Sequence, residues 1–187
     1  NQIKLTNKSS EKKSFTLFSY IEFCLWNAMD DMTNYQRNLN TGEVEVVDST
    51  IYHKTEYRER RNHFAVYSVN APVDGFDTSR DEFLGAYRGV TDPQVVEEGK
   101  SHNSITSGWY PIGSHQINVT LEPGETKSFI FVLGYCENPK DEKFVAPNVI
   151  NKKPADVLLA KYQTDEQVDA ALAALKANWE DLLSKFT

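Results

Sequence analysis

The chain has 187 residues, of which 40% are hydrophobic and 25% charged, which is ordinary for a globular protein with a core. Twenty lysines and arginines against 27 aspartates and glutamates give a formal net charge of −7. This acidic balance argues against nonspecific binding to nucleic acid or to an anionic membrane surface. The sequence has no run of 18 apolar residues, so it predicts no transmembrane helix.

The first residues, from Asn1 to Leu5, have neither an initiator methionine nor the basic and apolar regions of a signal peptide. They also begin inside a strand-like pattern. We therefore expect a piece of a longer protein that is cytoplasmic.

Cysteine and histidine usage argues against several classes of site. Cys24 and Cys136 each lie in an apolar, strand-like run, which favours reduced, buried thiols over a disulfide bridge or a reactive thiol. The four histidines show no metal-ligand spacing and no cysteine cluster joins them, so we expect no metal site. The sequence also has no P-loop, no dinucleotide-binding glycine motif and no Gly-x-Ser-x-Gly nucleophile elbow.

As far as about residue 135, the chain has the pattern of strands separated by turns. In residues 14–23 the odd positions from Phe15 to Phe23 make one mostly apolar face, while Phe18 and Tyr20 lie on the other. Apolar residues on both faces predict a central strand. Further strand patterns occupy residues 43–46, 51–55 and 64–69.

The middle of the chain is less regular. Residues 80–87 predict one short helical turn, in which Phe83 and Tyr87 share a face. Residues 91–109 are rich in loop signals, and such a segment is either functional or packed over a sheet edge.

The segments 115–121 and 127–133 flank Glu122-Pro123-Gly124-Glu125, which is a strong turn signal, and together they predict a β-hairpin. Repeated strands without interleaved amphipathic helices predict a mainly β fold, an antiparallel β-sandwich, over residues 1–150.

Residues 151–187 predict helices instead. Pro154 suits a first helical turn, and Thr164-Asp165-Glu166-Gln167 is a capping-box pattern. A long apolar stripe at helical spacing follows, formed by Val168, Leu172, Leu175, Trp179, Leu182, Leu183 and Phe186. The stripe either folds back on the sandwich or belongs to a helical linker that leads to a further domain.

Six stretches in chain order carry a resemblance to a known family. They are residues 18–28 (FSYIEFCLWNA), 34–39 (NYQRNL), 52–63 (YHKTEYRERRNH), 83–85 (FLG), 107–112 (SGWYPI) and 129–135 (FIFVLGY). Together they resemble the cellobiose phosphorylases of glycoside hydrolase family 94. Matches of this length over nearly the whole chain are much more specific than one short motif.

The resemblance implies an architecture and a reaction. The chain would be the C-terminal part of the family's N-terminal β-sandwich (a supersandwich, here incomplete), followed by linker helices towards an (α/α)6 barrel. The implied reaction is reversible phosphorolysis of cellobiose to glucose 1-phosphate and glucose, with inorganic phosphate as co-substrate and no metal or organic cofactor. The family's catalytic aspartate and phosphate-binding groups lie in the barrel, so the resemblance assigns no catalytic residue to this chain.

The resemblance does imply a substrate-binding pair, Gln36 and Arg37. In the family the matching residues lie on a sandwich loop that reaches the active site of the other subunit of a homodimer and helps to form the acceptor-sugar site. Arginine offers a planar fork of donors and glutamine both a donor and an acceptor, which suits sugar hydroxyls. A structural arginine that holds the loop is the alternative.

Other polar and aromatic residues are weaker candidates for a functional role. Asp30 and Asp31 are adjacent, and adjacent side chains diverge in strands and helices alike, so they make a poor acid/base pair. The charged segment from Glu56 to His63 is either a salt-bridged surface or a direct sugar contact. Trp109 and Tyr110 are candidates for sugar stacking because we expect them in a loop.

Three functions stay open on the sequence alone. The first is a noncatalytic segment of a disaccharide phosphorylase that supplies dimer contacts and part of the acceptor site. The second is a stand-alone carbohydrate-binding β-sandwich, and the third is a structural interaction domain.

Overall fold

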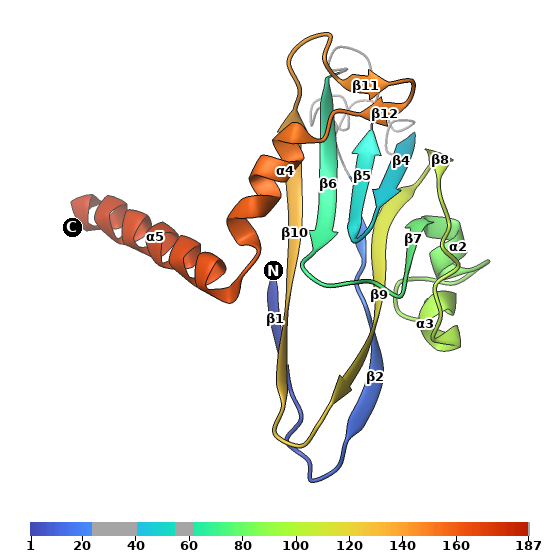
Figure 1. Cartoon of the computed structure of the whole chain (residues 1–187), viewed down its shortest axis with the longest axis vertical. Coiled ribbons are helices and arrows are strands. Elements are labelled where there is room, and N and C mark those ends of the chain that lie inside the picture. The colour runs from blue at the N-terminus through green and yellow to red at the C-terminus, as the bar shows by residue number, and fades with distance from the viewer. Residues whose placement is uncertain (24–40, 55–61, 187) are drawn as a thin grey trace.

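The computed structural model describes residues 1–23, 41–54 and 62–186, except for the side chains of Thr41, Trp109 and Phe186. Figure 1 shows an elongated sandwich with two short helices on one side and a helix that projects away. The larger antiparallel sheet has the order β1 (Gln2–Thr6), β10 (Thr126–Glu137), β6 (His63–Val69), β5 (Thr50–Lys54), β4 (Thr41–Val47) and β8 (Ser107–Trp109). The predicted mainly β, antiparallel sandwich is therefore confirmed.

The smaller sheet is built around the long strand β9 (Pro111–Leu121). One edge of β9 pairs with β2 (Lys13–Phe18) and β3 (Ile21–Glu22), and the other edge pairs with β7 (Gly75–Ser79). Two further strands, β11 (Phe144–Ala146) and β12 (Val149–Ile150), form a ribbon of their own.

The main core lies between the two sheets. Strand β6 is buried throughout because its successive side chains point alternately into this core and into a second one. Its Ala65, Tyr67 and Val69 enter the core between the sheets, whereas Phe64 and Val66 enter a second core on the opposite face. A strand covered on both faces is hydrophobic at nearly every position.

The second core is closed by α4 (Lys153–Leu159). Ala155 and Leu159 are buried there against Phe64, Val66 and Cys136. Cys136 is a free, buried thiol, as predicted, and burial raises its pKa. Cys24 lies outside the described residues.

The predicted hairpin between residues 115–121 and 127–133 is wrong. The turn exists, with Glu125 N donating to Glu122 O at 3.0 Å and Gly124 in a left-handed conformation, but β9 and β10 belong to different sheets. The turn is therefore an arch that crosses from one sheet to the other. A second crossing, between β1 and β2, lies against it, because Gly124 N donates to Asn7 O and Asn7 N to Glu125 O.

The two faces predicted for the strand over residues 14–23 are confirmed, but its predicted central position in a sheet is wrong. Leu17, Ile21 and Phe23 join the main core, and Phe18 and Tyr20 pack on the opposite face. However, the strand is interrupted at Ser19 and Tyr20, and among the described residues its two parts, β2 and β3, form the edge of the smaller sheet rather than its centre.

The outer face of that edge is covered by α2 (Arg80–Leu84) and α3 (Gln94–Glu98). Phe83, Leu84 and Val95 form a third core with Ile112. The predicted helical turn at residue 80 is present, but it ends at Leu84. Tyr87 therefore does not share a face with Phe83; it is fully exposed and has a positive φ of 61°.

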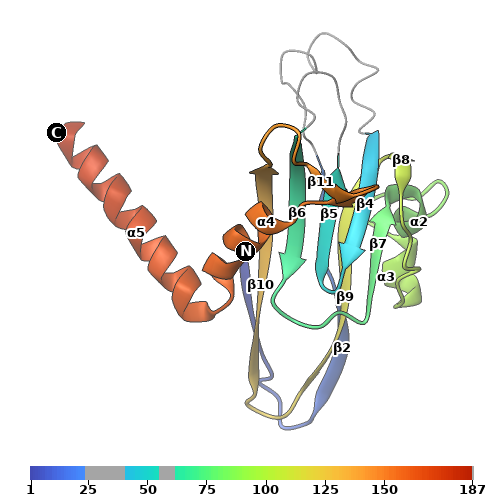
Figure 2. The same cartoon turned by 45° about the horizontal axis from the view of Figure 1, so that its top comes forward.

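The C-terminal part continues from α4 through the 3-10 helix η2 (Ala160–Tyr162) to α5 (Asp165–Leu183) and a second 3-10 helix, η3 (Ser184–Phe186). The predicted capping box is confirmed, because Thr164 Oγ1 accepts from Gln167 N and Gln167 Oε1 accepts from Thr164 N. Figures 1 and 2 show α5 pointing away from the sandwich, and none of its residues is buried. The alternative in which the stripe folds back on the sandwich is therefore wrong. Within the described residues, no helix is long and apolar enough to cross a membrane.

Candidate functional site

Two segments that carry predicted functional residues leave the sandwich at the same end. Residues 24–40 run between Phe23 and Thr41, and residues 55–61 run between Lys54 and Asn62. The register of the larger sheet places these attachment points together, because Glu43 pairs with Lys54 and Lys54 with Phe64. We call this region the loop end, defined by Phe23, Gly42, His53, Lys54, Asn62 and His63; its neighbourhood is at the top of Figure 1.

The predicted sugar-binding residues Gln36 and Arg37 lie in the first of these segments, outside the described residues, and so do Asp30, Asp31 and residues 56–61. Their roles remain predictions. What the structure does describe is the scaffold from which both segments start.

A buried histidine organises that scaffold. The ring of His53 is 0% exposed and stacks on Phe23, with the ring centroids 5.0 Å apart. Gly42 also lies against this ring, and an added Cβ there would overlap His53 Nε2. Phe23 is one of the four attachment points, and Gly42 and His53 are each next to another, so this packing joins three of the four attachment points.

A buried lysine connects the loop end to the β11–β12 ribbon. Lys54 is 7% exposed, and its Nζ donates to Asn148 O at 2.7 Å and lies 3.7 Å from Glu43 Oε2. A buried ammonium is costly unless it is hydrogen-bonded or paired, so these partners keep β5 and the ribbon together. Beside it, Lys152 pairs with Glu45 and lies 5.2 Å from the centre of the Tyr52 ring.

The fourth attachment point is held by a reciprocal pair of asparagines. Asn62 Nδ2 donates to Asn138 O at 2.7 Å, and Asn138 N donates to Asn62 O at 2.9 Å. The neighbouring His63 is buried and stacks on Tyr135, with centroids 5.8 Å apart. The sandwich therefore fixes both ends of both segments, as a rigid scaffold does for a binding loop.

The described residues also bear on the other sites that the sequence suggested. Within residues 1–23, 41–54 and 62–186, no group of three or more histidine, cysteine, aspartate or glutamate side chains is placed to hold a metal ion. The sequence predicts Trp109 in a loop, but this residue lies in strand β8. The structure does not describe its side chain. Tyr110 follows with a φ of 49°, and the Arg80 guanidinium lies 5.5 Å from the centre of its ring.

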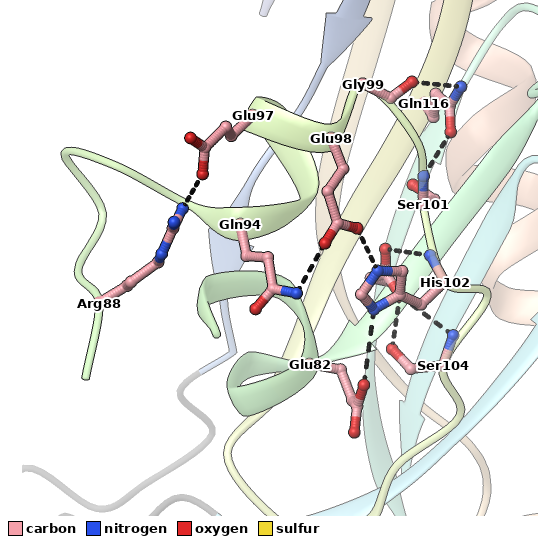
Figure 3. Close-up of polar contacts among 11 residues, drawn as sticks. Glu82, Arg88, Gln94, Glu97, Glu98, Gly99, Ser101, His102, Ser104 and Gln116 are labelled. Atoms are coloured by element: carbon pink, nitrogen blue, oxygen red, sulfur yellow. Dashed lines mark hydrogen bonds and ion pairs between the residues drawn. The ribbon is translucent and has the colours of Figure 1, made fainter. Parts of the chain in front are cut away.

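A second polar cluster, which the sequence analysis did not identify, joins α2, α3 and the loop after α3. His102 Nε2 lies 2.8 Å from Glu98 Oε2, and His102 Nδ1 lies 3.5 Å from Glu82 Oε2, as Figure 3 shows. The contact with Glu98 raises the pKa of His102 and lowers that of Glu98. Both ring nitrogens face carboxylates, which favours the doubly protonated imidazolium.

The loop that carries His102 is held by hydrogen bonds to Asp77 of β7, whose side chain is completely buried. Asp77 Oδ2 accepts from His102 N at 3.1 Å, and Asp77 Oδ1 accepts from Ser104 N at 3.1 Å and from Ser104 Oγ at 2.7 Å. A buried carboxylate with three donors keeps the loop in one conformation. Sequence reasoning missed this cluster because Glu82 and Asp77, which contact His102 or its loop, are 20 and 25 residues away in sequence.

Comparison with known proteins adds an independent finding. Residues 1–165 match the family described as "Glycosyl hydrolase 94, supersandwich domain". The chain is 30% identical over 188 residues to an N,N'-diacetylchitobiose phosphorylase of Vibrio proteolyticus and 28% identical over 190 residues to that of Vibrio furnissii. It is 24% identical over 183 residues to a solabiose phosphorylase of Paenibacillus borealis.

These alignments cover 98%, 98% and 94% of this chain but only 21%, 21% and 24% of the relatives, so the chain spans about a fifth of their length. The motifs of the sequence analysis, the sandwich fold and the match over residues 1–165 agree. The chain therefore belongs to the supersandwich domain family of glycosyl hydrolase family 94.

Proposed function

We propose that this chain is a noncatalytic segment of a disaccharide phosphorylase, in which it supplies dimer contacts and part of the acceptor-sugar site. The observation that carries the proposal is the match of residues 1–165 to the supersandwich domain of family 94. The names of the relatives support it, since they are phosphorylases of N,N'-diacetylchitobiose and of solabiose. The partners of the chain would be the barrel of the same protein, a second subunit in a homodimer, and the sugar.

In the proposed reaction, phosphate attacks the anomeric carbon of the disaccharide, the glycosidic bond breaks, and the products are a sugar 1-phosphate and a free sugar. An inverting hydrolase needs a general acid and a general base with a water between them. Phosphate replaces that water and already carries negative charge, so one acid suffices, and the barrel supplies it. The proposal therefore needs no metal or organic cofactor, and it places the enzyme in the cytoplasm.

Gln36 and Arg37 are the residues we propose to contact the acceptor sugar. The geometry of the loop end supports this role, because the segment that carries them starts from Phe23 and Gly42, which pack on the buried His53. A segment with both ends fixed loses less conformational freedom when it binds, which favours binding.

For the substrate we propose cellobiose, from the resemblance of the sequence motifs. N,N'-diacetylchitobiose is the second candidate, favoured by the identities of 30% and 28% with two phosphorylases of that sugar. The two differ at C2 of each ring, where cellobiose has a hydroxyl and N,N'-diacetylchitobiose an acetamido group.

The test is phosphorolysis by the full-length protein of cellobiose, N,N'-diacetylchitobiose and solabiose, with inorganic phosphate present or omitted. We expect phosphate-dependent release of a sugar 1-phosphate from one of the first two, and no release by the isolated chain. Absence of phosphate-dependent turnover of all three sugars would contradict the phosphorylase proposal and favour a stand-alone carbohydrate-binding domain. Turnover by the isolated chain would contradict the noncatalytic role.

A further inference from the structure

The structure contains a cavity beside the helices α2 and α3. It lies between α2, residues 85–93, α3 and His102, and its volume is about 560 Å³. In Figure 1, α2 and α3 stand on the flank of the smaller sheet. Cavities of roughly 300–1,000 Å³ hold small organic ligands.

The walls of this cavity are held in place by contacts within the chain. Arg88 pairs with Glu97, Gln94 Nε2 donates to Glu98 Oε1 at 2.7 Å, and His102 contacts Glu98 as well. Figure 3 shows Arg88 on one side of the opening, with Glu82 and His102 on the other and Gln94 between them. The cavity is therefore formed before any ligand binds.

The lining has the composition expected for a neutral ligand with many hydroxyl groups. Each cationic group of the lining is paired with a carboxylate: Arg80 with Glu22, Arg88 with Glu97, and His102 with Glu98 and Glu82. Arg88 uses its Nη1 for Glu97 and for Asp92 O, which leaves other N–H groups of its fork to donate. Glu82 faces His102 through one oxygen, and its second oxygen can accept. The lining thus offers both donors and acceptors, and its cations are paired within the chain.

An exposed aromatic ring stands beside these groups. Tyr87 lines the cavity, is fully exposed, and has a φ of 61°. Non-glycine residues with such angles are uncommon, and they cluster at sites where the surrounding structure enforces them. A flat apolar face next to mixed polar groups is complementary to a sugar ring, which has an apolar C–H face and a polar rim.

We propose that this cavity binds a neutral saccharide, with Tyr87 stacking on one face of the ring and Arg88, Gln94 and Glu82 forming hydrogen bonds to its hydroxyls. The residues proposed to contact the saccharide here do not include Gln36 or Arg37. The site gives the domain a second sugar-binding surface, whichever disaccharide the full-length protein uses.

The test is an NMR titration of the ¹⁵N-labelled chain with glucose, N-acetylglucosamine and cellobiose. The measured quantity is the change in the chemical shift of each backbone amide. We expect saturable shifts in residues 80–104, with a dissociation constant on the order of millimolar, as befits one ring and a few hydrogen bonds. Tyr87→Asn removes the ring but tolerates the positive φ, so it should weaken binding by about tenfold or more. Tyr87→Phe should bind within about twofold of the wild type, because the ring is retained.

A matched control is Tyr162→Ala, which removes a tyrosine from η2, on the other side of the sandwich, and should not change the affinity. No shifts with any of the three sugars would overturn the proposal. Shifts confined to residues outside 80–104, or equal affinity of the wild type and Tyr87→Asn, would overturn it as well. None of these results would bear on phosphate-dependent turnover, which tests the proposed function separately.

Discussion

At the scale of single residues, the loop end depends on Gly42. A Cβ at this position would overlap His53 Nε2 and approach the Lys54 carbonyl oxygen. We expect Gly42→Ala to lower the free energy of unfolding by about 1–3 kcal/mol, which is typical of overpacking a buried site. Urea unfolding followed by circular dichroism measures this change.

Gly89→Ala is the matched control, because an added Cβ there meets no atom within 4 Å. It should change the stability little. Equal stability of the two variants would show that His53 can move aside, and it would contradict the view that this ring fixes the start of both segments.

His102 should make the stability of the α2–α3 region depend on pH. Its pKa is raised in the folded protein, first by Glu98 and then by Asp77 and Glu82, against the burial that lowers it. Protonation therefore stabilises the fold: the contribution is complete below the unfolded pKa of about 6.5 and is lost as the pH rises through the higher folded pKa. We expect the stability difference between the wild type and His102→Gln to shrink between about pH 6 and pH 9.

Denaturant unfolding of both proteins over this pH range measures the difference. Glu98→Gln is the matched variant, because it removes the carboxylate that raises the pKa and should flatten the profile. A difference that grows with pH would have the wrong sign and would contradict an imidazolium between the two carboxylates.

At the scale of elements, α4 rests on a glycine of β10. A Cβ at Gly134 would overlap Leu158 Cδ2 and touch Val66. Gly134→Ala should therefore destabilise the protein by about 1–3 kcal/mol in the wild type but much less in a Leu158→Ala background, where the space is free. A double-mutant cycle of unfolding free energies measures this coupling. Strict additivity of the two substitutions would show that α4 does not dock closely on β10.

Some elements could be predicted from the sequence because their signals are local. The capping box at Thr164 and Gln167 needs only residues three positions apart, and the two faces of residues 14–23 follow from a period of two. The arch after β9 could not be predicted, because Pro123-Gly124 signals a reversal of the chain but not the sheet that the next strand joins. That choice depends on Asn7, more than a hundred residues away, which hydrogen-bonds to the turn.

The candidate sites also combine residues that local sequence indicates with residues that only the fold brings together. Gln36 and Arg37 came from a family resemblance that rests on contiguous sequence. Gly42 meets His53 because the register of β4 and β5 places Val44 opposite His53, and Phe23 reaches the same ring from the end of β3 in the other sheet. No local pattern indicates these contacts, nor the contact of His102 with Glu82, whereas Glu98 and His102 are only four residues apart.

At the scale of the whole molecule, the chain is a scaffold with two features that matter for the full-length protein. One is the loop end, from which residues 24–40 and 55–61 leave the sandwich. The other is the apolar face of α5, where Leu175 and Trp179 are 53% and 51% exposed. A soluble monomer rarely exposes a long apolar stripe, so we expect this face to be covered in the full-length protein.

The central claim is that the loop end brings Arg37 to the acceptor sugar of the other subunit. The most direct measurement is the kinetics of full-length Arg37→Ala, with Lys12→Ala, an exposed lysine near the arches, as control. We expect the KM for the disaccharide, and for the acceptor sugar in synthesis, to rise about ten- to a hundredfold, as for a lost charge-assisted hydrogen bond. The KM for phosphate should change much less. Mixed dimers of Arg37→Ala subunits with subunits that lack the catalytic acid should regain activity, because one of their two sites is intact. Unchanged acceptor kinetics would contradict the sugar contact, and loss of acceptor binding without rescue in mixed dimers would contradict the sharing between subunits.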